Sequence, residues 1–218
     1  MKNENLKVAP IKIDQLDQVS RVHTDVFGDS FLSQVGPQAV NKYYEWLMTP
    51  PNKCHAIGVF EAEQLLGFCY AGVFRNAEVH FIKENISFLF GQIIKKPSLW
   101  FSRKLWERLG SSLAAFADHI KPKSKEKLRE LDAVRKARFG ILSIAVSSTH
   151  QGLGIGRMLE QEAEHIARIN GYPRMVLSVN PENRNAVSFY KKNGWREIYP
   201  NKSQRWEGFM EKKLTLQG

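Results

Sequence analysis

The sequence contains no run of eighteen apolar residues, and its opening stretch, MKNENLKVAPIKIDQ, lacks the apolar segment that a signal peptide requires. We therefore expect a cytoplasmic protein. Cysteine is scarce: Cys54 and Cys69 are the only two, they have no metal-ligand spacing, and both lie in predicted strands, where a buried and reduced thiol is usual. These absences argue against a disulfide framework and a cysteine metal centre, and we expect no bound metal.

The composition excludes a disordered or fibrous chain. Hydrophobic residues make up 43% and charged residues 25% of the sequence, close to ordinary globular usage. A length of 218 residues fits one decorated domain better than two full domains. We expect a single domain over residues 1–218 with an insertion at about 76–137.

The net charge of +10 is concentrated in one region. Residues 76–138 hold 14 Lys and Arg against 7 Asp and Glu, and therefore carry +7 of the total. A basic balance suits nucleic acid, an anionic membrane surface or an anionic small molecule as a partner. Because the sequence has no recognised nucleic-acid-binding motif, we expect no nucleic-acid partner.

Apolar spacing divides the chain into alternating strands and helices. The pattern predicts helices at 16–27, 38–48, 154–170 and 183–193, and strands at 8–13, 55–60, 65–74, 139–147 and 175–180, followed by two strands that end near Leu214. The continuous apolar run at 139–147 indicates a strand buried on both faces. In the insertion, apolar residues at helical spacing from Ile82 to Ile93, and again after Pro97 and Pro122, predict two or three amphipathic helices. This alternation indicates an α/β fold, a mixed sheet with helices on both faces.

The most informative segment joins the buried strand to the next helix and reads Val146-Ser-Ser-Thr-His-Gln-Gly-Leu-Gly-Ile-Gly-Arg157. Glycine lets backbone N–H groups turn outward together and lets a ligand approach the main chain. With the positive end of the following helix, such groups form a site for a phosphate or diphosphate, to which Arg157 adds a charge-assisted contact. Taken alone, the pattern also fits a tight turn. A dinucleotide-binding loop fits less well, because the glycines run G-x-G-x-G and no ribose-binding acid follows.

This segment resembles the acetyl-CoA motif of the GNAT superfamily of N-acetyltransferases, because Gln151-x-x-Gly154-x-Gly156 follows an apolar strand with Ile144-Ala-Val146. A second stretch is similar to the family's downstream motif, with Trp where Phe is commoner: Asn183-x-x-Ala186-x-x-x-Tyr190-x-x-x-Gly194-Trp195. Two motifs in the right order are more specific than either one. The resemblance is clear over 139–200 and holds in outline over 1–75, and it implies a mostly antiparallel central sheet flanked by helices.

The resemblance implies acetyl-CoA as co-substrate and gives its contacts. Ile144, Ala145 and Val146 would line the pantetheine arm, with Ile144 and Val146 pairing through their backbones. Asn183 would contact the arm near its reacting end, and the Tyr190 hydroxyl would lie near the thioester sulfur. Asn183 equally suits a helix N-cap, and Tyr190 also suits plain packing against the sheet. The diphosphate would lie on the amides of Gln151, Gly152, Leu153, Gly154, Ile155 and Gly156.

Acetyl transfer to an amine requires a neutral amine and a proton for the departing thiolate. An alkylamine with a pKa of about 10.4 is neutral roughly one time in a thousand at pH 7, so a base or a water chain is expected. Tyr190 is the candidate acid, because its ordinary pKa near 10 is close to that of an alkyl thiol. A backbone N–H around Val146 is the candidate donor to the carbonyl oxygen.

The base is less well defined. Many members of the family carry a carboxylate on the strand before the cofactor loop, but 139–147 contains none, and Ser143 is its main polar candidate. Asp29, Glu78 and His80 are alternatives that would act directly or through water, and each also fits an ordinary surface residue.

The resemblance favours an enzyme that moves an acetyl group to a primary amine by direct attack in a ternary complex. The acceptor predicted from the basic insertion is an anionic small molecule such as a nucleotide-linked amino sugar. A peptide or protein amine, and a non-catalytic acyl-CoA-binding module, stay open as alternatives. The insertion also suits amphipathic helices that pack on the sheet, or contact with an anionic membrane surface, and a homodimer stays open too.

Overall fold

The structure of the chain is a computed structural model. It describes residues 5–52, 54–73, 77–97, 139–199 and 206–215. The strands are β1 (Leu6–Pro10), β2 (His55–Glu61), β3 (Gln64–Gly72), β4 (Phe139–Val146), β5 (Arg174–Ser178), β6 (Arg196–Glu197) and β7 (Phe209–Lys213). The helices are α1 (Leu16–Val26), α2 (Phe31–Val35), α3 (Pro37–Met48), α4 (Ala77–Glu84), α5 (Ile86–Ile94), α9 (Ile155–Ile169) and α10 (Arg184–Lys192), with short 3-10 turns η1 (Ile13–Gln15) and η2 (Ser148–His150).

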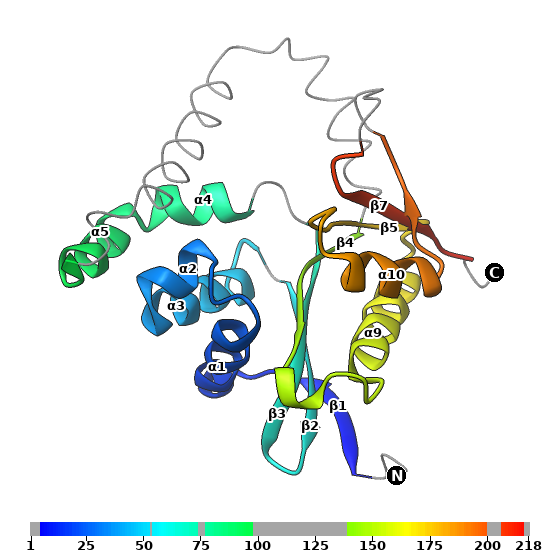
Figure 1. The fold of residues 1–218 in the computed structure, drawn as a ribbon, viewed down its shortest axis with the longest axis horizontal. Helices are drawn as coiled ribbons and strands as arrows, with labels where there is room; N and C mark the ends of the chain where they lie inside the picture. Colours follow the sequence, from blue (N-terminus) through cyan, green and yellow to red (C-terminus); the bar gives the residue numbers. More distant parts are fainter. Residues whose placement is uncertain (1–4, 53, 74–76, 98–138, 200–205, 216–218) are drawn as a thin grey trace.

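The strands form one seven-stranded sheet in the order β1-β2-β3-β4-β5-β7-β6. Its described strand pairs are antiparallel except for β4 with β5. Helices α1 to α3 cover one face, and α9 and α10 cover the other (Figure 1). The expected mixed, mostly antiparallel sheet flanked by helices is confirmed. Among the described helices, none is long and apolar enough to span a bilayer.

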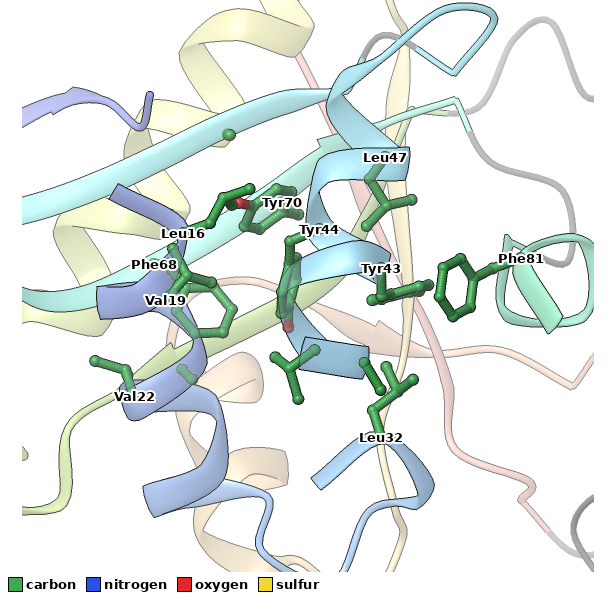
Figure 2. Close-up of a cluster of buried hydrophobic side chains, with 14 of the residues drawn as sticks. Leu16, Val19, Val22, Leu32, Tyr43, Tyr44, Leu47, Phe68, Tyr70 and Phe81 are labelled. Atoms are coloured by element: carbon green, nitrogen blue, oxygen red, sulfur yellow. The ribbon is translucent and has the colours of Figure 1, made fainter. Parts of the chain in front are cut away.

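Aromatic packing defines the core between the sheet and α1 to α3. Figure 2 shows Tyr44 of α3 lying between α1 and the sheet, beside Phe68 and Tyr70 of β3. The Tyr44 ring centroid is 5.3 Å from that of Phe68 and 4.4 Å from that of Tyr70, distances at which aromatic pairs attract. The α1 side of this core is the apolar stripe predicted from helical spacing, of which Leu16, Val19 and Val22 are buried.

Prolines and caps set the boundaries around α1 to α3. The strand predicted at 8–13 is wrong at its end: β1 stops at Pro10, Ile11 N makes one further hydrogen bond to the Ala56 carbonyl at 2.9 Å, and a 3-10 turn begins at Ile13. Pro37 opens α3 at the first helical position, as predicted. Helix α2 was not predicted from the sequence; its five residues are too few for periodicity, and it begins where the Ser30 side chain accepts a hydrogen bond from the Ser33 amide.

The described part of the insertion contains two helices, α4 and α5. The spacing of Ile82, Ile86, Leu89 and Ile93 instead predicted one continuous apolar stripe on a single helix. Asn85 separates α4 from α5, and its side-chain amide donates to the Phe81 carbonyl at 3.0 Å, which competes with helix continuation. Because the stripe is interrupted there, Ile86 is 44% exposed whereas the other three are buried. The helices predicted after Pro97 and Pro122 lie outside the described residues.

Both cysteines are free thiols. Cys69 is buried in β3, as predicted, but Cys54 is half-buried immediately before β2 and not within a strand. Burial raises the pKa of the Cys54 thiol to about 12 and also raises the pKa of Cys69. Both groups are therefore uncharged and unreactive near neutral pH.

A buried charge cluster ties β7 to α9 on the opposite face of the sheet. Glu160 is 1% exposed, and its carboxylate accepts hydrogen bonds from Trp195 Nε1 at 3.0 Å and Lys212 Nζ at 2.7 Å. Lys212 also pairs with Glu164. The interaction holds the C-terminal strand against the helix that follows the glycine-rich loop.

We expect Lys212→Met to lower the free energy of unfolding by about 2–3 kcal/mol, because it leaves the buried Glu160 carboxylate without its cation. Urea denaturation measures the effect. The matched control is Lys213→Met on the same strand, where the side chain is exposed and the change should stay within about 0.5 kcal/mol. Equal losses in the two variants would show that the buried pair contributes nothing specific.

Candidate functional site

Strand β4 separates from β5 after its first two residues. The two strands pair only at Phe139 and Gly140, whereas β4 continues to pair with β3 as far as Val146. Beyond Gly140, no described strand pairs with the β5-facing edge of β4, and we call this stretch the open edge of β4. This corrects the prediction of a strand buried on both faces: Leu142, Ser143, Ile144 and Val146 are only half-buried.

The alternation of the β3–β4 ladder shows which backbone groups face the open edge. Ser147 N donates to Leu66 O at 2.8 Å, so the Ser147 backbone faces β3. Because an antiparallel ladder alternates, the N–H and C=O groups of Ile144 and Val146 point the other way, toward the gap. One of these groups is engaged in the structure: the Gln151 side-chain amide donates to the Val146 carbonyl at 3.3 Å.

A β-bulge lies where β4 begins to diverge. Tyr70 is opposite Ser143 and Ala71 is opposite Ile141, so Leu142 is an extra residue on β4. A bulge bends its strand and increases the local twist. This irregularity accounts for β4 leaving β5 within two residues of Gly140.

The glycine-rich loop connects η2 to α9 and presents free amides. Gly152 and Gly154 have φ of +82° and +83°, and a Cβ at either position would have nothing within 4 Å. These glycines are therefore required by backbone conformation and not by lack of space. Within the described parts of the chain, no hydrogen-bond partner is found for the amides of Gly152, Gly154, Ile155 and Gly156.

The first turn of α9 is held close to the sheet beside this loop. Ile155 is buried, and Gly67 of β3 makes room for it, since a Cβ at Gly67 would lie 2.9 Å from the Ala145 carbonyl and 3.1 Å from Ile155. Arg157 is exposed on the same turn. The positive end of the helix dipole and the free amides therefore lie at the end of the open edge of β4.

Asn183 and Tyr190 lie on α10, next to α9. Asn183 is the N-cap of α10: its Oδ1 accepts from the Ala186 amide at 3.1 Å, and no residue that the structure describes accepts a hydrogen bond from its NH₂ group. Tyr190 is 6% exposed and packs against the rings of Phe189 and Trp195. Within the described residues, its hydroxyl has no hydrogen-bond partner.

Burial raises the pKa of the Tyr190 hydroxyl, with smaller contributions from Cys69 and Glu160. The hydroxyl is therefore protonated at physiological pH, and it holds its proton more tightly than an ordinary tyrosine whose pKa is near 10. Tyr190 belongs to the same buried cluster as Cys69, the β3 residue opposite Ile144, and Ile144 and Val146 pack against that cluster.

Asp25 at the end of α1 is a contact that the sequence analysis missed. Its carboxylate accepts hydrogen bonds from Ser148 N at 2.7 Å, Ser148 Oγ at 2.9 Å and Ser147 Oγ at 3.3 Å. These bonds, first from the Ser148 backbone and then from its hydroxyl, lower the pKa of Asp25. They fasten the segment after β4 to α1 across 123 residues of sequence, a separation at which no local pattern gives a signal.

The candidates for the base differ in their surroundings. Asp29 is exposed between α1 and α2, and His80 is exposed on α4; no hydrogen bond joins either to β4 in the described chain. The Glu78 side chain lies outside what the structure describes. Ser143 is instead bonded: its Oγ lies 3.0 Å from the Tyr44 hydroxyl, which lies 2.8 Å from His23 Nδ1.

The described residues contain no group of three or more His, Cys, Asp or Glu side chains that could hold a metal ion. The site consists of backbone amides, a strand edge and hydroxyl groups. Such a set binds and orients an anionic, extended ligand.

A family model described as the acetyltransferase (GNAT) family matches residues 19–195. Comparison with curated protein sequences gives no significant match.

Solved structures share the fold at low sequence identity. PaiA N-acetyltransferase of Thermoplasma acidophilum, solved in complex with coenzyme A, is 14% identical with a TM-score of 0.52, covering 96% of this chain and 99% of its own. The ribosomal-protein-S18-alanine N-acetyltransferase of Escherichia coli is 11% identical with a TM-score of 0.55, covering 98% and 96%. YncA of Salmonella typhimurium, solved with its cofactor acetyl-CoA, is 14% identical with a TM-score of 0.56, covering 98% and 96%.

Proposed function

Because this chain belongs to the acetyltransferase (GNAT) family, we propose that it moves the acetyl group of acetyl-CoA to a primary amine of an anionic small molecule. It is an acetyl-CoA-dependent N-acetyltransferase, since acetyl-CoA is the acetyl donor of the family. The observation that carries the proposal is the open edge of β4, which leads directly to the free amides of the glycine-rich loop.

The donor fits this edge in one direction. Its diphosphate lies on the amides from Gln151 to Gly156, at the positive end of α9 and within reach of Arg157. Its pantetheine arm runs along β4 and takes the place of the missing strand, pairing with the backbones of Ile144 and Val146 around Ala145. In that complex the pantetheine arm replaces the Gln151 side-chain amide as the hydrogen-bond donor to the Val146 carbonyl.

The thioester then lies between two different faces of the sheet. Tyr190 is on the face of the sheet covered by α9 and α10. From that face its protonated hydroxyl donates a hydrogen bond to the departing sulfur. Asn183 contacts the pantetheine arm near the thioester. The acceptor approaches from the other face and attacks directly in a ternary complex. Holding both reactants in attack geometry supplies much of the rate enhancement.

The charge of the chain favours an anionic acceptor. The insertion holds +7 of the net +10, of which residues 77–97 carry +1 and the rest falls outside the described part of the chain. Its described helices α4 and α5 lie on the face of the sheet from which the acceptor approaches (Figure 1). A nucleotide-linked amino sugar combines a primary amine with negative charge and suits the positive net charge of the insertion sequence.

The test is release of coenzyme A thiol from acetyl-CoA across a panel of amines. We expect turnover with a nucleotide-linked amino sugar, a kcat/KM at least about 10-fold above that of the uncharged amino sugar, and a fall in this ratio as salt rises. Faster turnover with a peptide amine would reassign the acceptor class. Acetyl-CoA binding without turnover on any amine would indicate a non-catalytic acyl-CoA-binding module.

A further inference from the structure

A chain of hydrogen bonds leads from β4 to the surface at the connection between α1 and α2. Ser143 Oγ is 3.0 Å from the Tyr44 hydroxyl, which is 2.8 Å from His23 Nδ1. His23 Nε2 is 3.1 Å from Ser30 Oγ, which donates to Ser33 Oγ at 2.9 Å. Tyr44 is 0% and His23 6% exposed, whereas the three serines are half-buried. The middle of this hydrogen-bond chain, His23 and Tyr44, is therefore closed to water, and the serines at its two ends are accessible.

The hydrogens in this chain all point away from β4. Ser30 uses its hydroxyl hydrogen on Ser33, so it must accept from His23, and His23 therefore carries its hydrogen on Nε2. His23 Nδ1 is then an acceptor, and Tyr44 donates its single hydrogen to it. The Tyr44 oxygen in turn accepts from Ser143, which leaves the Ser143 oxygen with lone pairs and no hydrogen to offer on its accessible side.

We propose that Ser143, Tyr44 and His23 form a relay that takes a proton from the ammonium group of the acceptor and delivers it to solvent at Ser33; the relay rests on the proposed function. One N–H bond of the ammonium breaks, and its proton goes to Ser143 as the Ser143 hydrogen passes to Tyr44. The Tyr44 hydrogen passes to His23 Nδ1, the Nε2 hydrogen to Ser30, the Ser30 hydrogen to Ser33, and the Ser33 hydrogen to water. The nitrogen keeps the electron pair of the broken bond and becomes a neutral nucleophile, and no residue of the relay ends with a charge.

The position of Ser143 suits this role. It follows the bulge at Leu142 and precedes Ile144, whose backbone faces the open edge. Its side chain is on the α1 and α3 face, as its bond to Tyr44 requires, whereas Tyr190 packs in the core on the opposite face. The group that removes a proton from the amine and the group that supplies one to the sulfur are thus on opposite sides of the thioester. Ser143 is the catalytic residue, and Tyr44 and His23 are positioning residues that act through it.

The surroundings keep the relay uncharged. Burial lowers the pKa of His23 to about 4, so its ring is neutral and its Nδ1 lone pair is available. Burial also raises the pKa of Tyr44, so its hydroxyl keeps its hydrogen. The titratable groups near the relay on neighbouring elements are Tyr43 of α3 and Tyr70 of β3, whose rings pack on Tyr44, and the Cys54 thiol before β2. The Cys69 thiol of β3 packs on the opposite face of the sheet. Burial raises the pKa of Tyr70, Cys69 and Cys54, so these three carry no charge near neutral pH.

The test is the pH dependence of kcat/KM in Ser143→Ala and Tyr44→Phe. With an alkylamine acceptor, each variant should lose about 100-fold at pH 7, because solution then supplies few neutral amines. The deficit should shrink as pH approaches the acceptor's pKa of about 10.4, and it should be absent for an acceptor amine whose pKa lies below 7. The affinity for acetyl-CoA should not change in either variant. Urea denaturation checks that Tyr44→Phe is folded, and Ser143→Ala keeps the test decisive if it is not.

The matched control is Tyr70→Phe. Tyr70 is as buried as Tyr44 and contacts its ring, but its hydroxyl donates to Met48 Sδ at 3.7 Å and lies off the relay, so its pH profile should match that of the unaltered protein. A loss in Ser143→Ala that is the same at every pH and for both amines, or no loss at all, would overturn the relay while leaving the proposed function in place. Absence of turnover by the unaltered protein on every amine would overturn both.

Discussion

Gly154→Asp is expected to weaken acetyl-CoA binding by roughly 100-fold or more. A change of this size corresponds to the loss of one or two charge-assisted hydrogen bonds to the diphosphate. The carboxylate would lie at the first turn of α9, beside the free amides of Gly152, Ile155 and Gly156. There it repels the negative charge that those amides bind. Isothermal titration calorimetry with acetyl-CoA measures the change in Kd.

Gly171→Asp separates this effect from backbone strain. Gly171 follows the other end of α9, has a φ of +74° close to the +83° of Gly154, and likewise has nothing within 4 Å of a built Cβ. Both variants therefore carry a similar conformational cost of about 1 kcal/mol. Only Gly154→Asp should lose affinity. Unchanged binding in that variant would mean that the diphosphate does not lie on the glycine-rich loop.

Tyr190→Phe is expected to lower kcat by about 100- to 1000-fold with little change in the Kd for acetyl-CoA. The hydroxyl has no hydrogen-bond partner in the described chain, so its removal breaks no contact that holds the fold. Its proposed partner is the sulfur of the departing thiolate, which carries negative charge only as the reaction proceeds. Stabilisation that appears only then affects turnover and not binding.

Steady-state kinetics and a direct binding measurement on the same preparation distinguish these quantities. Tyr172→Phe is the control: Tyr172 packs against Phe139, with ring centroids 5.3 Å apart, near the point where β4 and β5 separate, and it should retain full kcat. Unchanged turnover in Tyr190→Phe would remove this residue from the mechanism. A thermal unfolding curve that matches the unaltered protein would exclude a packing defect.

Local sequence patterns predicted the elements whose cause is local. The spacing of Leu16, Val19 and Val22 predicts α1 because one helix face repeats every three or four residues. The glycine-rich loop was recognisable because a positive φ at Gly152 and Gly154 favours that residue type whatever packs nearby. Family membership was visible for the same reason, since both motifs that carry the resemblance are short and contiguous.

The arrangement across the site could not be read from the sequence, because it depends on contacts between distant segments. An apolar run at 139–147 looks alike whether or not a neighbouring strand follows it, so the gap beside β4 became apparent only from the bulge at Leu142 and the two-residue pairing with β5. Tyr44 and Ser143 are 99 residues apart, and in the sequence one is a helix-face aromatic and the other a lone polar residue in a strand. Their chemistry arises from the packing of α1 and α3 on the sheet, which brings the half-buried Ser143 hydroxyl within hydrogen-bond distance of the buried Tyr44 hydroxyl, and that hydroxyl within hydrogen-bond distance of the buried His23 imidazole.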